Sequence, residues 1–133
     1  GLALELGPLV LVTGDLALLH DSNGWLHAAQ GDPPLLVLLI DNQGGGIFQQ
    51  LPIESSQFDR LFAMPQRVNP LALAEAYGIA GRQVACLEDL PDALDWGLAQ
   101  GRPALLRLST DREADARLRT QLRTAAQNAE PML

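Results

Sequence analysis

Two short, uninterrupted apolar runs constrain the fold more than any other feature of the sequence. Residues 9–13 (LVLVT) and 35–40 (LLVLLI) contain no charge, and each is followed directly by polar, turn-forming residues. Runs of this length without polar alternation are typical of strands buried on both faces, as in a parallel sheet covered by helices. We therefore expect both runs to be buried strands of an α/β domain.

Helix and strand signals alternate along the rest of the chain. Further strands are expected at residues 84–87 and 103–108, and helices are expected to end at Gly7 and to span residues 21–30, 70–77 and 89–101. Strands that alternate with helices imply right-handed crossovers and a parallel sheet. The predicted fold class is α/β, a parallel sheet with helices on both faces.

The sequence predicts a last helix that begins at a capping box, residues 110–113 (TDRE). We expect its arginines to form a solvated face with the pairs Glu113–Arg117 and Asp115–Arg119. Its predicted buried stripe is Ala114, Leu118, Leu122 and Ala125.

Composition excludes several classes of function. The 133 residues include sixteen acidic and nine basic residues, for a net charge of −7, which argues against nucleic acid as a partner. All nine basic residues are arginine, so Schiff-base chemistry and a Walker phosphate loop, which need lysine, are excluded.

Cys86 is the single cysteine, which excludes an internal disulfide, and we expect it to be a buried apolar residue. No apolar run approaches the length of a membrane span and no signal peptide is evident, so we expect a cytoplasmic protein.

Polar residues follow the two apolar runs at the predicted strand ends. Gly14 and Asp15 follow the first run, and residues 41–44 (DNQG) follow the second. Because parallel strands end at the same edge of a sheet, we expect these groups to meet there. A carboxylate, an amide oxygen and a carbonyl in a glycine turn suit Mg²⁺, and the helix after Asp15 offers amides to an anion. A magnesium site with a phosphate-bearing cofactor is one interpretation, and ordinary turn formation by Asp15 and Asn42 is the alternative.

The same residues resemble a known motif. Gly14-Asp15, an interval of some 25 to 30 residues, and then Asn42 with Gly44 two positions further on resemble the cofactor-binding motif of the thiamine diphosphate-dependent enzymes. Within that family, residues 14–24, 41–52 and 71–78 resemble the synthases of menaquinone and phylloquinone biosynthesis. Two positions depart from the pattern: Asp41 replaces a usual asparagine, and Ala17 stands where serine is common.

The resemblance implies a site for thiamine diphosphate and Mg²⁺. By position, the metal ligands would be Asp15, Asn42 and the Gly44 carbonyl. The residues implied to contact the cofactor are Gly14, Asp15, Leu16, Ala17, Asn42, Gly44 and Ile47. Those implied to contact substrate are Ile47, Phe48 and Leu51.

The resemblance also implies that this chain is one domain of a larger protein and that other domains supply the remaining functional residues. Residues 1–133 would be its C-terminal, diphosphate- and Mg-binding domain and would lack the first strand or strands of that domain. The implied activity is the decarboxylation of 2-oxoglutarate and addition of the remaining unit to isochorismate. The activating glutamate is expected outside this chain, on the N-terminal pyrimidine-binding domain of a partner subunit in a homodimer or homotetramer. The chain alone is therefore expected to lack synthase activity.

Other functions stay open at this point. One is another thiamine diphosphate-dependent decarboxylase or an acetohydroxyacid synthase, against which residues 44–52 (GGGIFQQLP) argue. A non-catalytic assembly module is a second. A signalling receiver domain is disfavoured because the chain lacks lysine, and a Rossmann dinucleotide binder because no G-x-G-x-x-G follows the first strand. His20 and His27, placed on one helix face, are expected to be packing or surface residues rather than ligands.

Overall fold

The computed structural model describes residues 2–53 and 55–129. The chain divides into two compact units. The first, here called the sheet unit, comprises Gly1–Asp41 and Gln66–Ser109, and the second, the turn unit, comprises Asn42–Pro65 and Thr110–Leu133.

The sheet unit is an α/β domain, as the sequence predicts. Its strands are β1 (Leu9–Gly14), β2 (Leu35–Asp41), β3 (Ala80–Val84) and β4 (Ala104–Ser109). They form a parallel sheet in the order β1-β2-β4-β3. Its helices are α1 (Leu2–Leu6), α2 (Asp15–His20), α3 (Gly24–Gly31), α5 (Pro70–Ala76), the 3₁₀ turn η3 (Leu87–Asp89) and α6 (Leu90–Ala99).

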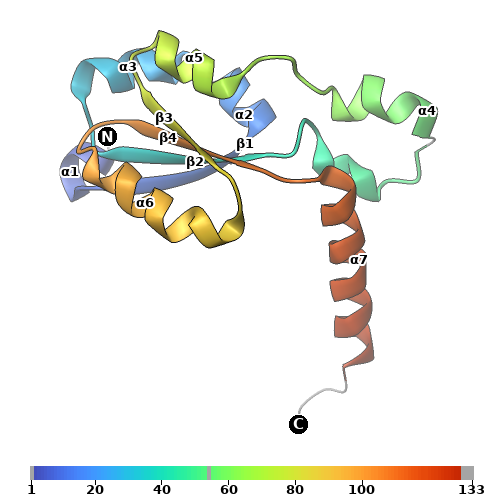
Figure 1. Ribbon diagram of the computed structural model, residues 1–133. Helices are drawn as coiled ribbons and strands as arrows, with labels where there is room; N and C mark the ends of the chain where they lie inside the picture. The colour runs from blue at the N-terminus through green and yellow to red at the C-terminus, as the bar shows by residue number, and fades with distance from the viewer. Residues whose placement is uncertain (1, 54, 130–133) are drawn as a thin grey trace. The chain divides into compact units, whose positions relative to one another are not determined.

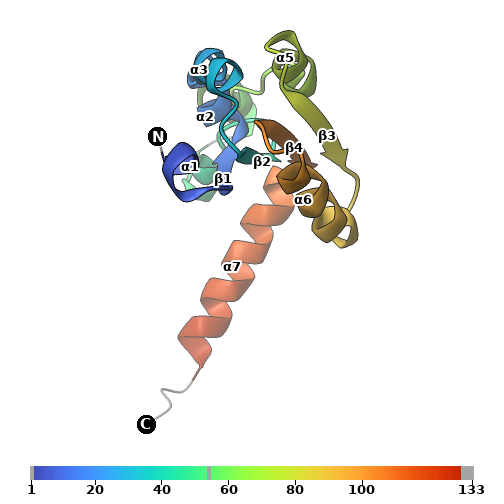
Figure 2. The same ribbon diagram turned by 90° about the vertical axis from the view of Figure 1, so that its left-hand side faces the viewer.

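Helices cover both faces of this sheet, with α2, α3 and α5 on one side and α6 on the other (Figures 1 and 2). The alternation of side chains along β2 supplies both cores. Val37 and Leu39 pack with Trp25 of α3, whereas Leu36 and Leu38 pack with Ala93 of α6. The two faces of β2 are therefore both buried, as its continuous apolar sequence predicts.

The expectation that residues 9–13 form a strand buried on both faces is wrong in part. These residues do form β1, but Val10 and Val12 are 42% and 61% exposed. Among the described strands β1 lies at the edge of the sheet and pairs only with β2. An apolar run predicts a strand but does not fix the number of its neighbours.

Several predicted boundaries also need correction. The third strand, β3, ends at Val84 instead of beginning there, so Cys86 lies beyond it and is exposed rather than buried. The helix predicted to begin at residue 21 or 22 is α3, which begins at Gly24. A separate short helix, α2, precedes it, so His20 and His27 lie on two different helices, and both are exposed.

Two helix-start predictions can be compared directly. Asn69 caps α5 as expected, because its Oδ1 accepts from the backbone N–H of Leu71 at 3.0 Å. The last helix is capped by Asp111 rather than by Thr110, since Asp111 Oδ1 accepts from the N–H of Ala114 at 2.6 Å. The N-cap of α7 therefore lies one residue later than the sequence predicts.

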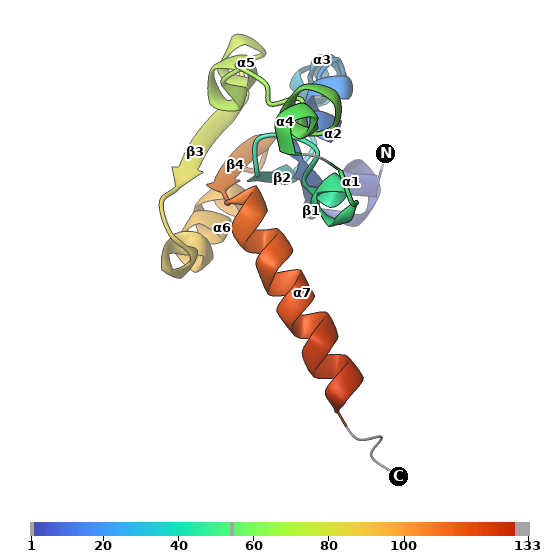
Figure 3. The same ribbon diagram turned by 90° about the vertical axis from the view of Figure 1, so that its right-hand side faces the viewer.

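The turn unit consists of short helical segments and one long helix (Figure 3). Its elements are the 3₁₀ helix η1 (Gly46–Gln50), α4 (Ser55–Phe58), the π-helical turn η2 (Asp59–Ala63) and α7 (Arg112–Asn128). The predicted buried stripe of α7 is wrong: Leu118 and Leu122 are 53% and 61% exposed, and none of the residues described in α7 is buried. The predicted ion pair of Glu113 with Arg117 is present at 3.7 Å.

No helix in the part of the chain that the structure describes is long and apolar enough to cross a membrane.

Candidate functional site

Asp15 lies at the carboxyl end of β1. Gly14 is the last residue of that strand and pairs in register with Ile40 of β2. Asp15 is the first residue of α2 and is only 8% exposed. Leu16 is half-buried and Ala17 is exposed. Within the sheet unit, a buried carboxylate therefore stands at the strand edge where the sequence places it.

Asp41, one of the two residues that depart from the family pattern, is paired within the sheet unit. Its Oδ2 accepts from Arg107 Nε at 2.7 Å and lies 2.7 Å from Arg107 Nη2. Asp41 is 6% exposed, and a carboxylate at that depth needs a compensating cation. The sequence does not reveal this pairing, because residues 66 positions apart meet only through the pairing of β2 with β4.

The glycine turn that follows β2 belongs to the turn unit. Asn42 is half-buried, and Gln43 and Gly44 have φ angles of 60° and 120°. A Cβ on Gly44 would overlap the backbone carbonyl of Ala63, so that position admits only glycine. The Ala63 carbonyl also accepts from the N–H of Gly45 at 2.7 Å. The turn is thus held against η2 by backbone contacts.

The apolar residues predicted to contact substrate lie on and just after η1. Ile47 and Leu51 are 70% and 49% exposed, and Phe48 is 37% exposed. The Phe48 ring meets Phe62 edge-on, with centroids 5.9 Å apart. These side chains are therefore accessible within the turn unit and are not core residues.

The donor chemistry fits Mg²⁺. Asp15 offers a carboxylate in the sheet unit, and the turn unit brings the Asn42 side chain and the Gly44 carbonyl into a single turn. The Gly44 carbonyl accepts from the N–H of Gly46 at 2.8 Å. A site with one or two carboxylates, completed by neutral oxygens and substrate phosphates, is typical of magnesium. Among the described residues there is no group of three or more His, Cys, Asp or Glu placed to hold a metal, so a carboxylate-rich or thiolate site is not formed there.

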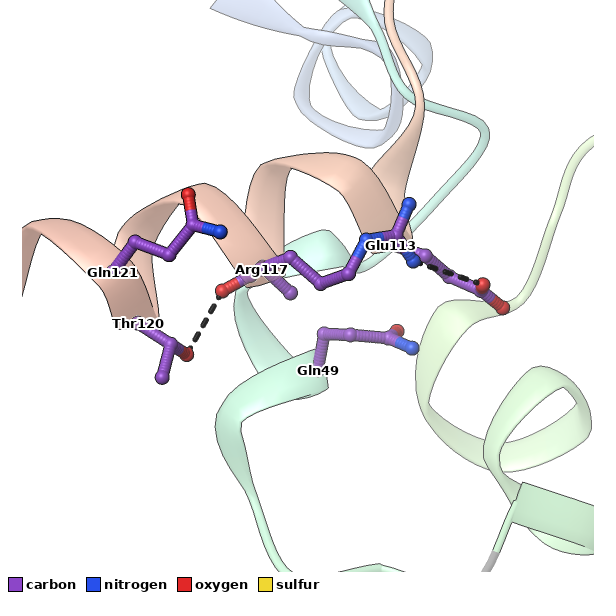
Figure 4. A pocket seen from close by; sticks show the side chains of 6 residues that line it. Gln49, Glu113, Arg117, Thr120 and Gln121 are labelled. Atoms are coloured by element: carbon purple, nitrogen blue, oxygen red, sulfur yellow. Dashed lines mark hydrogen bonds and ion pairs between the residues drawn. The ribbon is translucent and has the colours of Figure 1, made fainter.

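The turn unit contains a hollow that no sequence motif indicates. It has a volume of about 510 Å³ and lies against α7, with Gln49 contributed by η1 (Figure 4). Gln49, Arg117 and Thr120 border it, and Thr120 Oγ1 donates to the carbonyl of Ala116 at 3.0 Å. None of the predicted site residues lines this hollow.

Residues 1–108 match the family described as "Thiamine pyrophosphate enzyme, C-terminal TPP binding domain". The chain belongs to this family. The match includes every predicted metal-binding, cofactor-binding and substrate-binding residue and ends before α7.

Curated relatives give a finer comparison. The chain is 89% identical over 133 residues to 2-succinyl-5-enolpyruvyl-6-hydroxy-3-cyclohexene-1-carboxylate synthase of Parasynechococcus marenigrum (strain WH8102), covering 100% of this chain and 24% of that protein. It is 69% identical to the synthase of the same name from Synechococcus sp. (strain CC9902), covering 98% of this chain and 24% of the relative. The chain thus spans about a quarter of the length of these relatives.

Solved structures support the fold. Benzoylformate decarboxylase from Polynucleobacter necessarius matches with a TM-score of 0.67 and 20% identity, over 79% of this chain and 20% of that chain. The thiamine diphosphate-dependent 4-hydroxybenzoylformate decarboxylase of Rhodococcus jostii RHA1 matches with a TM-score of 0.66 and 24% identity, over 78% and 20%. At these identities the likeness establishes the α/β fold of the family.

Proposed function

We propose that this chain is the diphosphate- and Mg-binding part of a carboligase that decarboxylates 2-oxoglutarate and adds the resulting unit to isochorismate. The observation that carries the proposal is the 89% identity, over all 133 residues, to a relative that is named as the synthase of 2-succinyl-5-enolpyruvyl-6-hydroxy-3-cyclohexene-1-carboxylate. The structure supports it through the buried Asp15 at a strand end and the glycine-specific turn after Asn42.

In this proposal Asp15, Asn42 and the Gly44 carbonyl hold Mg²⁺. Thiamine diphosphate, when bound, supplies the electron sink for decarboxylation and carbon–carbon bond formation, and the protein supplies placement and electrostatics. Gly14, Leu16 and Ala17 provide backbone close to the diphosphate. This role for Ala17 needs no hydroxyl, because the contact is made by its N–H.

Ile47, Phe48 and Leu51 form the apolar side of the reaction space in this proposal. Their exposure on the turn unit leaves them available to a ligand. Apolar walls exclude water from the reacting carbon and so strengthen the electrostatic interactions made there.

We further propose that the activating glutamate and the cations that bind substrate carboxylates come from outside this chain, from the rest of the protein and from a partner subunit of a homo-oligomer. The chain spans about a quarter of its relatives, which leaves most of such a protein to supply them. On this basis the isolated chain has no synthase activity, because general acid–base catalysis and substrate positioning are both missing.

The test uses a full-length chimera, in which this chain replaces the matching quarter of the Parasynechococcus marenigrum relative. With Mg²⁺ and thiamine diphosphate, CO₂ release from 2-oxoglutarate and consumption of isochorismate are expected in equal amounts. Pyruvate and benzoylformate serve as competing substrates. Efficient turnover of either one, without coupling of 2-oxoglutarate to isochorismate, would favour a different decarboxylase or carboligase and overturn the proposal.

A further inference from the structure

Arg112, the first residue of α7, makes contacts that converge on the glycine turn. Its Nη1 donates to the backbone carbonyl of Gln43 at 2.8 Å, and its Nη2 donates to Asp59 Oδ1 at 2.6 Å. Its guanidinium carbon lies 5.8 Å from the centre of the Phe58 ring. The Arg112 side chain is 17% exposed, whereas that of Asp59 is 69% exposed. All of these residues belong to the turn unit.

The backbone that Arg112 contacts is conformationally demanding. Gln43 has a φ of 60°, in the left-handed region that residues other than glycine adopt at an energetic cost. Its carbonyl belongs to the peptide plane that joins Gln43 to Gly44. A charge-assisted hydrogen bond to that carbonyl therefore fixes the orientation of the plane that leads from Asn42 to Gly44.

The guanidinium is itself anchored. Asp59 and Phe58 hold it from η2 and α4, and the same segment of chain holds the turn through the bond from the Gly45 N–H to the Ala63 carbonyl. Because Arg112 presents rigid, coplanar donors, it can bond to Gln43 and Asp59 at the same time, which the single ammonium of lysine cannot match in geometry.

We infer that Arg112 is a positioning residue for the magnesium site, acting by fixing the peptide between the two ligands Asn42 and Gly44. This inference rests on the proposed function and deepens it. Arg112 lies beyond the residues 1–108 that match the family, so the family comparison does not assign it this role.

The inference makes a prediction about metal selectivity. Mg²⁺ demands near-ideal octahedral geometry, whereas Ca²⁺ accepts irregular and longer coordination. If Arg112 fixes the turn, its loss will weaken binding of Mg²⁺ more than binding of Ca²⁺. A purely structural role would lower the affinity for both metals by the same factor.

The experiment measures thiamine diphosphate binding to the full-length chimera by calorimetry over a range of Mg²⁺ or Ca²⁺ concentrations. Arg112→Met keeps the apolar stem and removes the guanidinium. We expect the Mg²⁺ concentration for half-maximal cofactor binding to rise about tenfold, as is typical for loss of an outer-shell partner, and the Ca²⁺ concentration to rise by a smaller factor. Arg117→Met is the matched control, since Arg117 lies on the same helix and is 67% exposed. It should change neither value.

A second variant keeps the test decisive if Arg112→Met fails to fold. Arg112→Lys retains the charge and should shift the preference between Mg²⁺ and Ca²⁺ in the same direction. An unchanged ratio of the two metal concentrations in a folded Arg112 variant would overturn the inference alone. Absence of Mg-dependent cofactor binding in the unsubstituted chimera would overturn the proposed function, and the inference with it.

Discussion

Cys86 shows how local surroundings decide the chemistry of a single residue. It is exposed, and the carboxylates of Glu88 and, to a smaller extent, Asp89 accept hydrogen bonds from its thiol and raise the pKa of Cys86. The pKa of the Glu88 carboxyl is lowered, first by its own backbone N–H and then by the thiol. Because the thiolate is the nucleophile, a raised pKa makes this accessible thiol slow to react near neutral pH.

Glu88→Gln should therefore make Cys86 more reactive. Removal of the charged acceptor lowers the thiol pKa, so a larger fraction is thiolate at any pH below that pKa. The alkylation rate by iodoacetamide, followed by mass spectrometry of the peptide that carries Cys86, should rise, and its pH midpoint should move down. Glu75→Gln, on α5, is the control. An unmoved midpoint in Glu88→Gln would show that the carboxylate does not govern the thiol.

Phe48 is the residue through which the proposed substrate contacts are best tested. Phe48→Ala in the full-length chimera should lower turnover of 2-oxoglutarate with isochorismate about tenfold or more and leave thiamine diphosphate affinity nearly unchanged. The reason is its place after the glycine turn on η1, beyond the proposed metal ligands. The edge-on contact with Phe62 contributes about 0.5–1.5 kcal/mol beyond area burial, so folding is checked first. Weakened cofactor binding with normal turnover at saturation would place Phe48 in the cofactor site instead.

At the scale of elements, the sequence predicts where regular structure forms better than it predicts what covers each element. The apolar run of β2 is buried on both faces because β1 and β4 flank it and helices lie over it. A similar run in β1 is exposed because β1 lies at the edge of the described sheet and pairs only with β2. The local sequence pattern does not encode this strand order. The third strand, AGRQV, is weakly apolar and forms through pairing with β4, which the sequence does not reveal. The amphipathic spacing of α7 predicts the helix correctly, but its leucines Leu118 and Leu122 are exposed rather than buried.

Helix α5 provides a prediction at this scale. Its cap residue, Asn69, accepts from the N–H groups of Leu71 and Ala72 at 3.0 and 3.4 Å. Asn69→Ala should destabilise the helix by about 1 kcal/mol, seen as faster amide hydrogen exchange in α5. Asn23→Ala is a matched control, because Asn23 stands at the N-cap of α3 and makes no side-chain capping bond. Equal effects of the two substitutions would contradict the capping role of Asn69.

At the scale of the whole molecule, the predicted ligands belong to different units: Asp15 to the sheet unit, and Asn42 and Gly44 to the turn unit. The sequence indicates Asp15, Asn42 and Gly44 because they follow apolar strands and match a spaced motif. It does not indicate that Arg107 pairs with Asp41 or Arg112 with Gln43, because these partners are 66 and 69 positions away. Local pattern thus finds the proposed ligand-binding groups, whereas the partners of Arg107 and Arg112 become visible only through tertiary contacts.

The central claim, that Asp15 and Asn42 hold the magnesium that binds the cofactor, is tested most directly by one calorimetric titration. Thiamine diphosphate is titrated into the full-length chimera and into its Asp15→Ala and Asn42→Ala variants, with and without Mg²⁺. Loss of a charge-assisted contact worth about 1.5–3 kcal/mol predicts a tenfold or larger loss of affinity with Mg²⁺ and little change without it. Asp21→Ala and Asn23→Ala, both at exposed positions, should bind like the unsubstituted protein. Unchanged Mg-dependent binding in both the Asp15 and the Asn42 variants would contradict the claim.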